Sequence, residues 1–169
     1  MKTLNQLFKM LSWIVIAAIA VYLAIAAPIL LGYRPMVVLS GSMEPTYPVG
    51  SITYYHKCTF DELEEGKPLT FYSGESLVTH RITTINELSR TVITKGDNNT
   101  AEDPVPVEEN QIVGQATDFA IPFAGYFVTY GKHPAVIAGM FAILLLHYGL
   151  DNIVSKRKKE SEGSNEKKA

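Results

Sequence analysis

The sequence predicts a mainly β domain that helices attach to a membrane. Three observations lead to this fold class: a long uncharged stretch near the N-terminus, a second apolar stretch near the C-terminus, and short β-rich segments separated by turn signals between them. With 169 residues, the chain has room for one modest domain plus attachments and little room for two large cores.

The composition excludes several classes of protein. Hydrophobic residue types make up 47% of the chain, which excludes a mostly disordered protein. The one cysteine, Cys58, excludes an intrachain disulfide framework and a four-cysteine zinc site. A net charge of −2 argues against a protein that binds nucleic acid through bulk positive charge, so we expect no nucleic-acid partner.

Residues 1–10 are expected to form a cytoplasmic N-terminus, and residues 11–31 a transmembrane anchor. The anchor stretch has twenty-one residues without a charge, and a transmembrane helix needs about 20. A cleaved signal peptide, with Lys2 and Lys9 as its basic end, is the alternative. The apolar region of a signal peptide is usually only ~7–15 residues long, so we favour the uncleaved anchor.

Residues 134–154 are predicted to form a second transmembrane helix, followed by a basic, disordered cytoplasmic tail at 155–169. The apolar part is short for a span, and a buried or interfacial helix is the alternative. The basic run at 156–159 favours the span, because Lys and Arg collect on the cytoplasmic side. With two spans, both chain ends lie in the cytoplasm and the intervening domain lies outside. Membrane lipid is then a partner of the protein.

Residues 33–132 form the predicted extracytoplasmic domain. From Arg34 to Lys132 there are seven Lys or Arg and thirteen Asp or Glu, a net charge of −6, to which we assign no partner. Five or six strands without a convincing amphipathic helix indicate an all-β barrel or sandwich. The β-rich segments are residues 36–40, 51–57, 68–72, 76–85, 90–95 and 111–121.

Metal and cofactor motifs are absent from the sequence, so we expect neither. It contains no HExxH, CxxC or GxGxxG, and the four histidines share no metal-ligand spacing. The segment from Gly125 to Lys132 is faintly similar to a phosphate-binding loop. It has one intervening residue too many, and His133 stands where Ser or Thr would bind magnesium.

Three short motifs of the domain carry serine, histidine and aspartate. Ser40 and Ser42 lie in SGSMEPT at the end of a predicted strand, where the glycine between them permits a tight turn that can present a hydroxyl. His80 lies in the strand-like THRI. Asp97 lies in the KGDNN turn, and Asp103 follows it. These are the ingredients of a Ser-His-Asp triad, which is recognised by geometry and not by chain order.

The motifs resemble the conserved boxes of type I signal peptidases. VLSGSMEPT, THRI and KGDNN with Asp103 carry the resemblance, which extends through LEEGKPLTF (63–71) and IPFAGY (121–126) and covers about residues 11–131. The histidine indicates the endoplasmic-reticulum-type branch, found in archaea, eukaryotes and sporulating Gram-positive bacteria. The usual bacterial branch has a lysine base there. Lys67 departs from the family pattern in a structural turn, where an Asp is usual.

The resemblance implies a role for each site residue. Ser42 is expected to be the nucleophile and His80 the general base. The backbone N–H of Ser42 and the hydroxyl of Ser40 are expected to form the oxyanion hole. Asp97 and Asp103 compete to orient the imidazole. The resemblance favours Asp103 for that role and Asp97 as a supporting residue.

The implied function is that of a membrane-bound serine endopeptidase that removes signal peptides from exported preproteins after small residues. It would be integral to the cell membrane or, in a eukaryote, the endoplasmic-reticulum membrane, with other membrane subunits as further partners. Two other classes stay open. One is a catalytically silent preprotein-binding subunit, which the presence of all four site residues disfavours. The other is a self-cleaving serine regulator, which uses lysine and lacks an anchor. In a Ser-Lys scheme of that kind Lys95 would be the base.

Overall fold

The computed structural model describes residues 2–166 of the chain, with side chains for residues 3–156. It divides into two compact units. One contains residues 24–128, and the other combines the N-terminal chain up to Leu23 with the chain from Thr129 onward.

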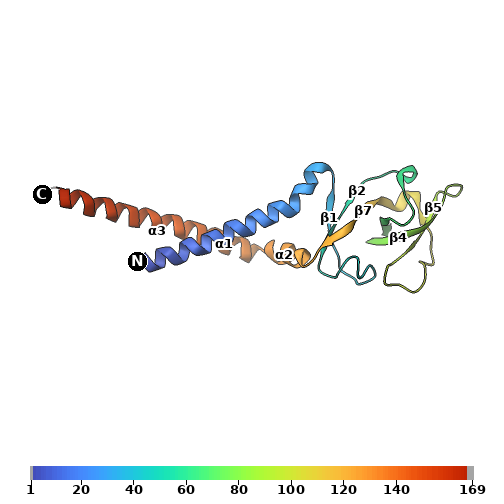
Figure 1. The fold of residues 1–169 in the computed structure, drawn as a ribbon, viewed down its shortest axis with the longest axis horizontal. Coiled ribbons are helices and arrows are strands. Elements are labelled where there is room, and N and C mark those ends of the chain that lie inside the picture. The colour runs from blue at the N-terminus through green and yellow to red at the C-terminus, as the bar shows by residue number, and fades with distance from the viewer. Residues whose placement is uncertain (1, 167–169) are drawn as a thin grey trace. The chain divides into compact units, whose positions relative to one another are not determined.

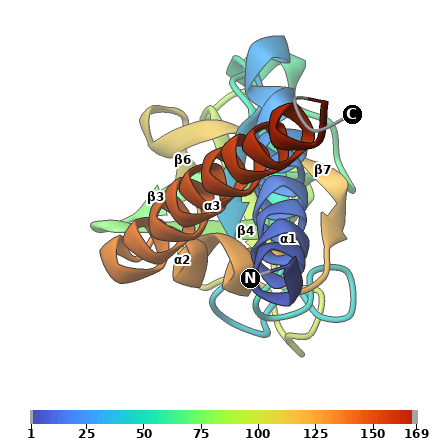
Figure 2. The same ribbon diagram turned by 90° about the vertical axis from the view of Figure 1, so that its left-hand side faces the viewer.

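The second unit is helical. Helix α1 (Lys2–Ala26) lies in it up to Leu23, and α3 covers Pro134–Glu166; the last residues of α1 and the 3-10 helix η1 (Ala27–Leu31) that continues it belong to the first unit. Figures 1 and 2 show α1 and α3 inclined to each other. Two stretches are long and apolar enough to cross a membrane: residues 3–31, with a mean hydropathy of 2.8, and residues 134–156, with 1.6. Both predicted anchor segments therefore lie in suitable helices.

The C-terminal tail differs from the sequence-based prediction. A disordered tail was predicted from residue 155, whereas α3 continues to Glu166. Low hydrophobicity favours disorder, but the tail is also rich in Lys, Arg and Glu, which have high helix propensity and extend a helix that has already begun. Residues 167–169 lie outside the described part of the chain.

The first unit is built on one seven-stranded antiparallel sheet, which confirms the mainly β prediction. The strand order is β1-β2-β7-β3-β4-β5-β6, so β1 and β6 form its edges. Each predicted segment overlaps a strand, although β1 begins at Arg34 and ends at Val37, before the predicted end at residue 40, and β6 is additional. The strands are β1 (Arg34–Val37), β2 (Ile52–His56), β3 (Pro68–Ser73), β4 (Ser76–Asn86), β5 (Thr91–Lys95), β6 (Val107–Glu108) and β7 (Ile112–Ile121). Short helices η2 (Phe60–Glu62), η3 (Glu109–Gln111) and α2 (Ala124–Gly131) complete the chain.

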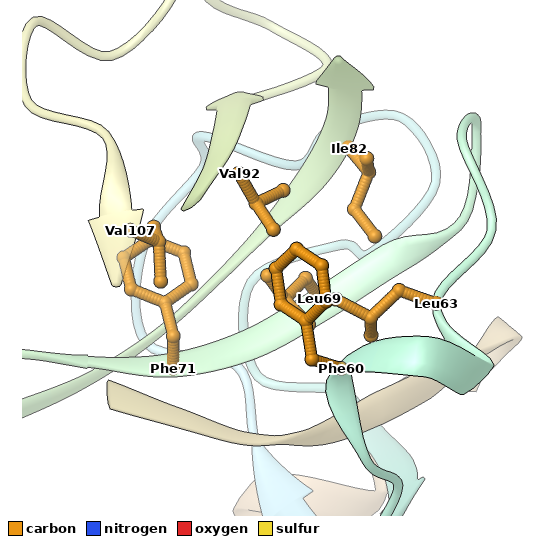
Figure 3. Packing of buried hydrophobic residues seen from close by; sticks show 7 residues of the cluster. All are labelled: Phe60, Leu63, Leu69, Phe71, Ile82, Val92 and Val107. Carbon is orange, nitrogen blue, oxygen red and sulfur yellow. The ribbon is translucent and has the colours of Figure 1, made fainter. Parts of the chain in front are cut away.

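The central hairpin of the sheet follows from local sequence. Strands β3 and β4 pair up to Ser73 and Ser76, which leaves a two-residue turn. Its first residue, Gly74, has φ 61°, a conformation that favours glycine and suits tight hairpin turns. On one side of the hairpin, buried side chains form a core (Figure 3): Phe60, Leu63, Leu69, Phe71, Ile82, Val92 and Val107.

A second cluster lies at the start of the unit. Ile25, Ile52, Tyr54 and Ala124 are buried together, and the Tyr54 hydroxyl donates a hydrogen bond to the Ile25 carbonyl at 2.8 Å. The end of the first helix is thereby fixed to strand β2 within this unit. The predicted site residues then lie on the long strand β4, in the loop between β1 and β2, and in the connection between β5 and β6.

Candidate active site

The predicted nucleophile lies in the loop that joins β1 to β2. Two tight turns shape this loop: the N–H of Glu44 donates to the carbonyl of Gly41 at 3.1 Å, and that of Tyr47 donates to Met43 at 2.8 Å. Met43 and Tyr47 are buried, so the loop is anchored directly after Ser42. Apolar anchors beside a polar turn explain why the serine is presented at a fixed place.

Tyr47 holds the loop through its hydroxyl group as well as through its buried ring. Its hydroxyl donates a hydrogen bond to the carbonyl of Thr117 on β7. Burial raises the pKa of Tyr47 to about 12, so the phenol stays protonated and remains a donor at every physiological pH. The loop is therefore tied to the sheet at a point five residues beyond Ser42.

The two serines of the loop lie next to each other. The Oγ atoms of Ser40 and Ser42 are 3.3 Å apart, within hydrogen-bond range. Both residues line a groove of about 430 Å³, together with residues 36–39 and residues 76–79 of β4. Thr79 and Met36 contact each other within it, Oγ1 to Sδ, at 3.7 Å. The proposed nucleophile and oxyanion donor thus face a space that a substrate could occupy.

His80 and Asp103 are brought together by the structure. His80 is 9% exposed on β4, and its Nδ1 lies 2.6 Å from Oδ2 of Asp103. Thr94 on β5 donates to the same carboxylate oxygen at 2.7 Å, and the Asp103 N–H donates to the Thr94 carbonyl at 2.8 Å. A carboxylate held at Nδ1 leaves Nε2 available as a proton acceptor.

Asp97 has different partners. Arg81 binds its carboxylate with two hydrogen bonds, of 2.7 and 2.6 Å, and the Thr46 hydroxyl donates to it at 2.6 Å. Partial burial acts to raise the pKa of Asp97, but the bonds from Arg81 and Thr46 outweigh it and hold the pKa below its usual value. Asp97 therefore links β4 to the serine loop and, among the described residues, makes no hydrogen bond to His80.

The serine and the histidine do not yet share a hydrogen bond. Within the described part of the chain, the side-chain partner of Ser42 is Ser40, and no bond joins Ser42 to His80. Catalytic hydrogen bonds are often long without substrate and tighten in its complex. The backbone supplies the link between them: the Asn98 N–H, in the turn after β5, donates to the Ser42 carbonyl at 2.9 Å. Strand β5 in turn pairs with β4, which carries His80.

The position of Lys95 argues against it as the catalytic base in place of His80. It pairs in register with Arg81, the neighbour of His80 on β4. Successive side chains of a strand point to opposite faces, so Lys95 and Arg81 share one face of the sheet and His80 points to the other.

Sequence reasoning missed four contributors to the site: Thr46, Arg81, Thr94 and Asn98. Strand alternation could have placed Thr94 on the buried face of β5, but its contact with Asp103 depends on how the following loop folds back.

Regarding metals, the described residues contain no group of three or more His, Cys, Asp or Glu side chains that could hold an ion.

Gly96 permits the turn after β5 to contact the serine loop closely. A Cβ atom at this position would lie 2.6 Å from the Ser42 carbonyl oxygen, which is backbone and cannot rotate away. We expect Gly96→Ala to push the turn off the loop and lower stability by about 1–3 kcal/mol. Thermal unfolding would measure the change in stability. Gly131→Ala is the matched control, because its Cβ meets nothing within 4 Å. Unchanged stability for Gly96→Ala would contradict the close contact.

Comparison of the sequence with known proteins identifies relatives that share one family. No protein-family model matches the chain. It is 39% identical over 99 residues to signal peptidase I W of Bacillus subtilis, which covers 56% of this chain and 52% of that protein. It is 30% identical over 124 residues to the catalytic subunit of the signal peptidase complex of Pyricularia oryzae, covering 64% and 70%. The chain belongs to the signal peptidase I family.

The human relative supports the same branch of the signal peptidase I family. It is a catalytic subunit of the signal peptidase complex, 30% identical over 128 residues that cover 66% of each chain. The endoplasmic-reticulum-type resemblance predicted from the motifs is confirmed by these relatives. The matched region spans about half the length of the Bacillus subtilis signal peptidase.

Proposed function

We propose that this chain is a membrane-bound serine endopeptidase that cleaves signal peptides from preproteins after small residues. The observation that carries the proposal is the His80–Asp103 pair, at 2.6 Å, in a signal peptidase family chain with Ser42 in a substrate-sized groove. The decisive experiment is cleavage of a model preprotein by the purified full-length protein, with the serine replaced in a matched variant.

The proposed reaction uses a covalent intermediate. Ser42 Oγ attacks the scissile carbonyl while Nε2 of His80 takes the hydroxyl proton. The imidazolium, stabilised by Asp103, returns that proton to the leaving amine as the peptide C–N bond breaks. Water then attacks the acyl-enzyme and gives a proton to His80. The imidazolium returns this proton to Ser42 Oγ as the ester C–O bond breaks, which releases the signal peptide and free Ser42. The N–H of Ser42 and the hydroxyl of Ser40 bind the negative oxygen in both steps.

Substrate binding is proposed along the groove beside Ser42. An edge strand offers unpaired backbone groups, and β1 is such an edge. An extended peptide pairing beside β1 would direct alternate side chains into the groove, where shallow pockets accept small residues. This preference matches the small residues that precede signal-peptide cleavage sites.

The two alternative functions lack comparable support. A catalytically silent subunit has no use for the bonded His80–Asp103 pair. A self-cleaving regulator of the Ser-Lys kind needs a lysine beside the serine, whereas Lys95 shares a sheet face with Arg81. Further membrane subunits are proposed partners by analogy with the relatives that are named as subunits of a complex.

The proposed topology has residues 1–10 and 155–169 in the cytoplasm, spans at 11–31 and 134–154, and the catalytic domain, 33–132, outside. A contact within the helical unit supports it: Asn5 donates to Asp151 at 3.5 Å, so the start of α1 lies beside the end of the apolar part of α3. Two helices paired in this way run antiparallel. The membrane would be the cell membrane or, in a eukaryote, that of the endoplasmic reticulum.

Chain length places the proposed nucleophile near the membrane. Ser42 comes eleven residues after Leu31, the end of the proposed first span. Even a fully extended link of this length reaches at most about 40 Å. A signal peptide presents its cleavage site just beyond its apolar core, at the same outer face.

Cysteine labelling tests this topology. In a Cys58→Ser background, Leu88→Cys and Ser164→Cys are expected to react from opposite sides of sealed vesicles. Leu88 is fully exposed in the catalytic unit, so its label reports access alone. A membrane-impermeant maleimide should label one position in intact cells and both after detergent permeabilisation, which is the control. Labelling of both positions in intact cells would eliminate the second span.

A further inference from the structure

Asn98 contacts both peptide groups that flank Ser42. Its side-chain Nδ2 donates to the Gly41 carbonyl at 3.2 Å, and its backbone N–H donates to the Ser42 carbonyl at 2.9 Å. The first contact concerns the proposed oxyanion hole, because the Gly41 carbonyl and the Ser42 N–H belong to the same peptide group. A bond to one end of this group fixes the direction of the other.

The turn that carries Asn98 is itself held from several sides. The Asn99 N–H donates to the Gly96 carbonyl at 2.9 Å, which closes the turn. Asp97, the preceding residue, is bound by Arg81 from β4 and by Thr46 from the serine loop. The amide of Asn98 therefore projects from a fixed backbone. Its side chain is exposed, so no part of the hydrophobic core depends on it.

We propose that Asn98 is a positioning residue for the oxyanion hole, an inference that rests on the proposed peptidase function. Its amide keeps the Gly41–Ser42 peptide plane oriented so that the Ser42 N–H points at the developing oxyanion. A hydrogen bond to a carbonyl also polarises the peptide group and strengthens its N–H as a donor. Donors that are oriented before reaction stabilise the transition state without reorganisation.

The loss of turnover expected on removing the Asn98 amide is smaller than the loss that would follow from removing the oxyanion-hole donor itself, the Ser42 N–H. Removing an oxyanion-hole donor outright costs on the order of 10²–10³ in turnover. Asn98 acts on such a donor through one peptide group, and the half-buried Gly41 carbonyl also accepts the N–H of Glu44 at 3.1 Å, so water and this bond can partly replace the amide. We therefore expect the loss to lie below this range, on the order of 10-fold.

The test compares two substitutions with a matched control. Asn98→Ala removes the amide donor and keeps the backbone N–H, while Asn98→Asp keeps the shape and turns a carboxylate oxygen toward the carbonyl. Asn110→Asp makes the same chemical change on η3, away from the groove, and should leave turnover unchanged. Cleavage of a model preprotein would give kcat and KM. Inhibition by a substrate-like peptide aldehyde, which forms a tetrahedral adduct with serine, would report transition-state binding.

Asn98→Ala is expected to lower kcat about 10-fold with KM and the thermal midpoint little changed. Affinity for the aldehyde should fall by the same factor, and Asn98→Asp should lose more. Wild-type kcat in folded Asn98→Ala, or a loss that follows the thermal midpoint, would overturn the positioning role while the peptidase function stands. A wild-type protein that does not cleave the preprotein would overturn both proposals.

Discussion

Ser42→Ala is expected to abolish preprotein cleavage while leaving the fold intact. For a serine nucleophile, loss of the hydroxyl lowers turnover by on the order of 10⁶, because no covalent intermediate forms. The structural cost is small. The Ser42 hydroxyl bonds to Ser40 at 3.3 Å, and such a bond contributes about 1 kcal/mol or less. The backbone bond from Asn98 to the Ser42 carbonyl does not depend on the side chain.

The measurement uses purified full-length protein in vesicles, with turnover and thermal midpoint determined for each variant. Ser89→Ala is the control, because Ser89 is exposed in the turn between β4 and β5 and lies outside the groove. It should cleave as the wild type does. Turnover by folded Ser42→Ala that is comparable to the wild type would remove the serine from the mechanism.

Local sequence patterns were sufficient for most of the fold. Long stretches without charged residues predicted the apolar helices, and β-rich segments separated by turn residues predicted six strand segments. Strand β6 has two residues, too few for any alternation to be recognised. The sheet arrangement needed strand pairing, which connects residues far apart in the chain, such as β2 with β7. Composition alone predicted a disordered tail, although its residue types also favour continuation of a helix.

For the site, too, local motifs predicted the residues, whereas their contacts depend on parts of the chain that are distant in sequence. Motifs predicted which residues to consider, including both aspartates. They could not reveal that the chain after Asn98 folds back, so that the Asp103 N–H reaches the Thr94 carbonyl and its carboxylate reaches His80. Nor could they pair Asp97 with Arg81, its partner across the turn. Both facts depend on strand register and loop path, which packing of the whole unit determines.

Asp103→Asn is expected to lower turnover far more than it lowers stability. Asparagine keeps the shape but not the charge that stabilises the imidazolium, and its amide can favour the wrong tautomer of His80. In serine proteases with this triad, that change lowers turnover by about 10⁴ while the geometry persists. The Asp103 backbone N–H still donates to Thr94, so the loop should keep its path.

Asp97→Asn is the paired variant and should show the opposite pattern. Asp97 makes an ion pair with Arg81 in which the carboxylate side chain is 14% exposed, and it accepts a bond from Thr46. Hydrogen bonds to a charged group contribute about 1.5–3 kcal/mol each, so removal of the charge should lower the thermal midpoint clearly. Activity should fall because less protein is folded and the serine loop is less well held, and cooling should recover part of it.

Turnover per folded molecule and the thermal midpoint, measured for both variants over a range of temperatures, separate the two roles. The low pKa of Asp97 adds a third readout. A carboxyl whose pKa is depressed by folding stabilises the native state above its unfolded pKa, and that stabilisation is lost as the pH falls through the folded value. The thermal midpoint of the wild type should therefore fall more steeply with decreasing pH than that of Asp97→Asn. A collapse of turnover at Asp97→Asn with an unchanged midpoint, together with near-normal turnover at Asp103→Asn, would reverse the assignment of the two carboxylates.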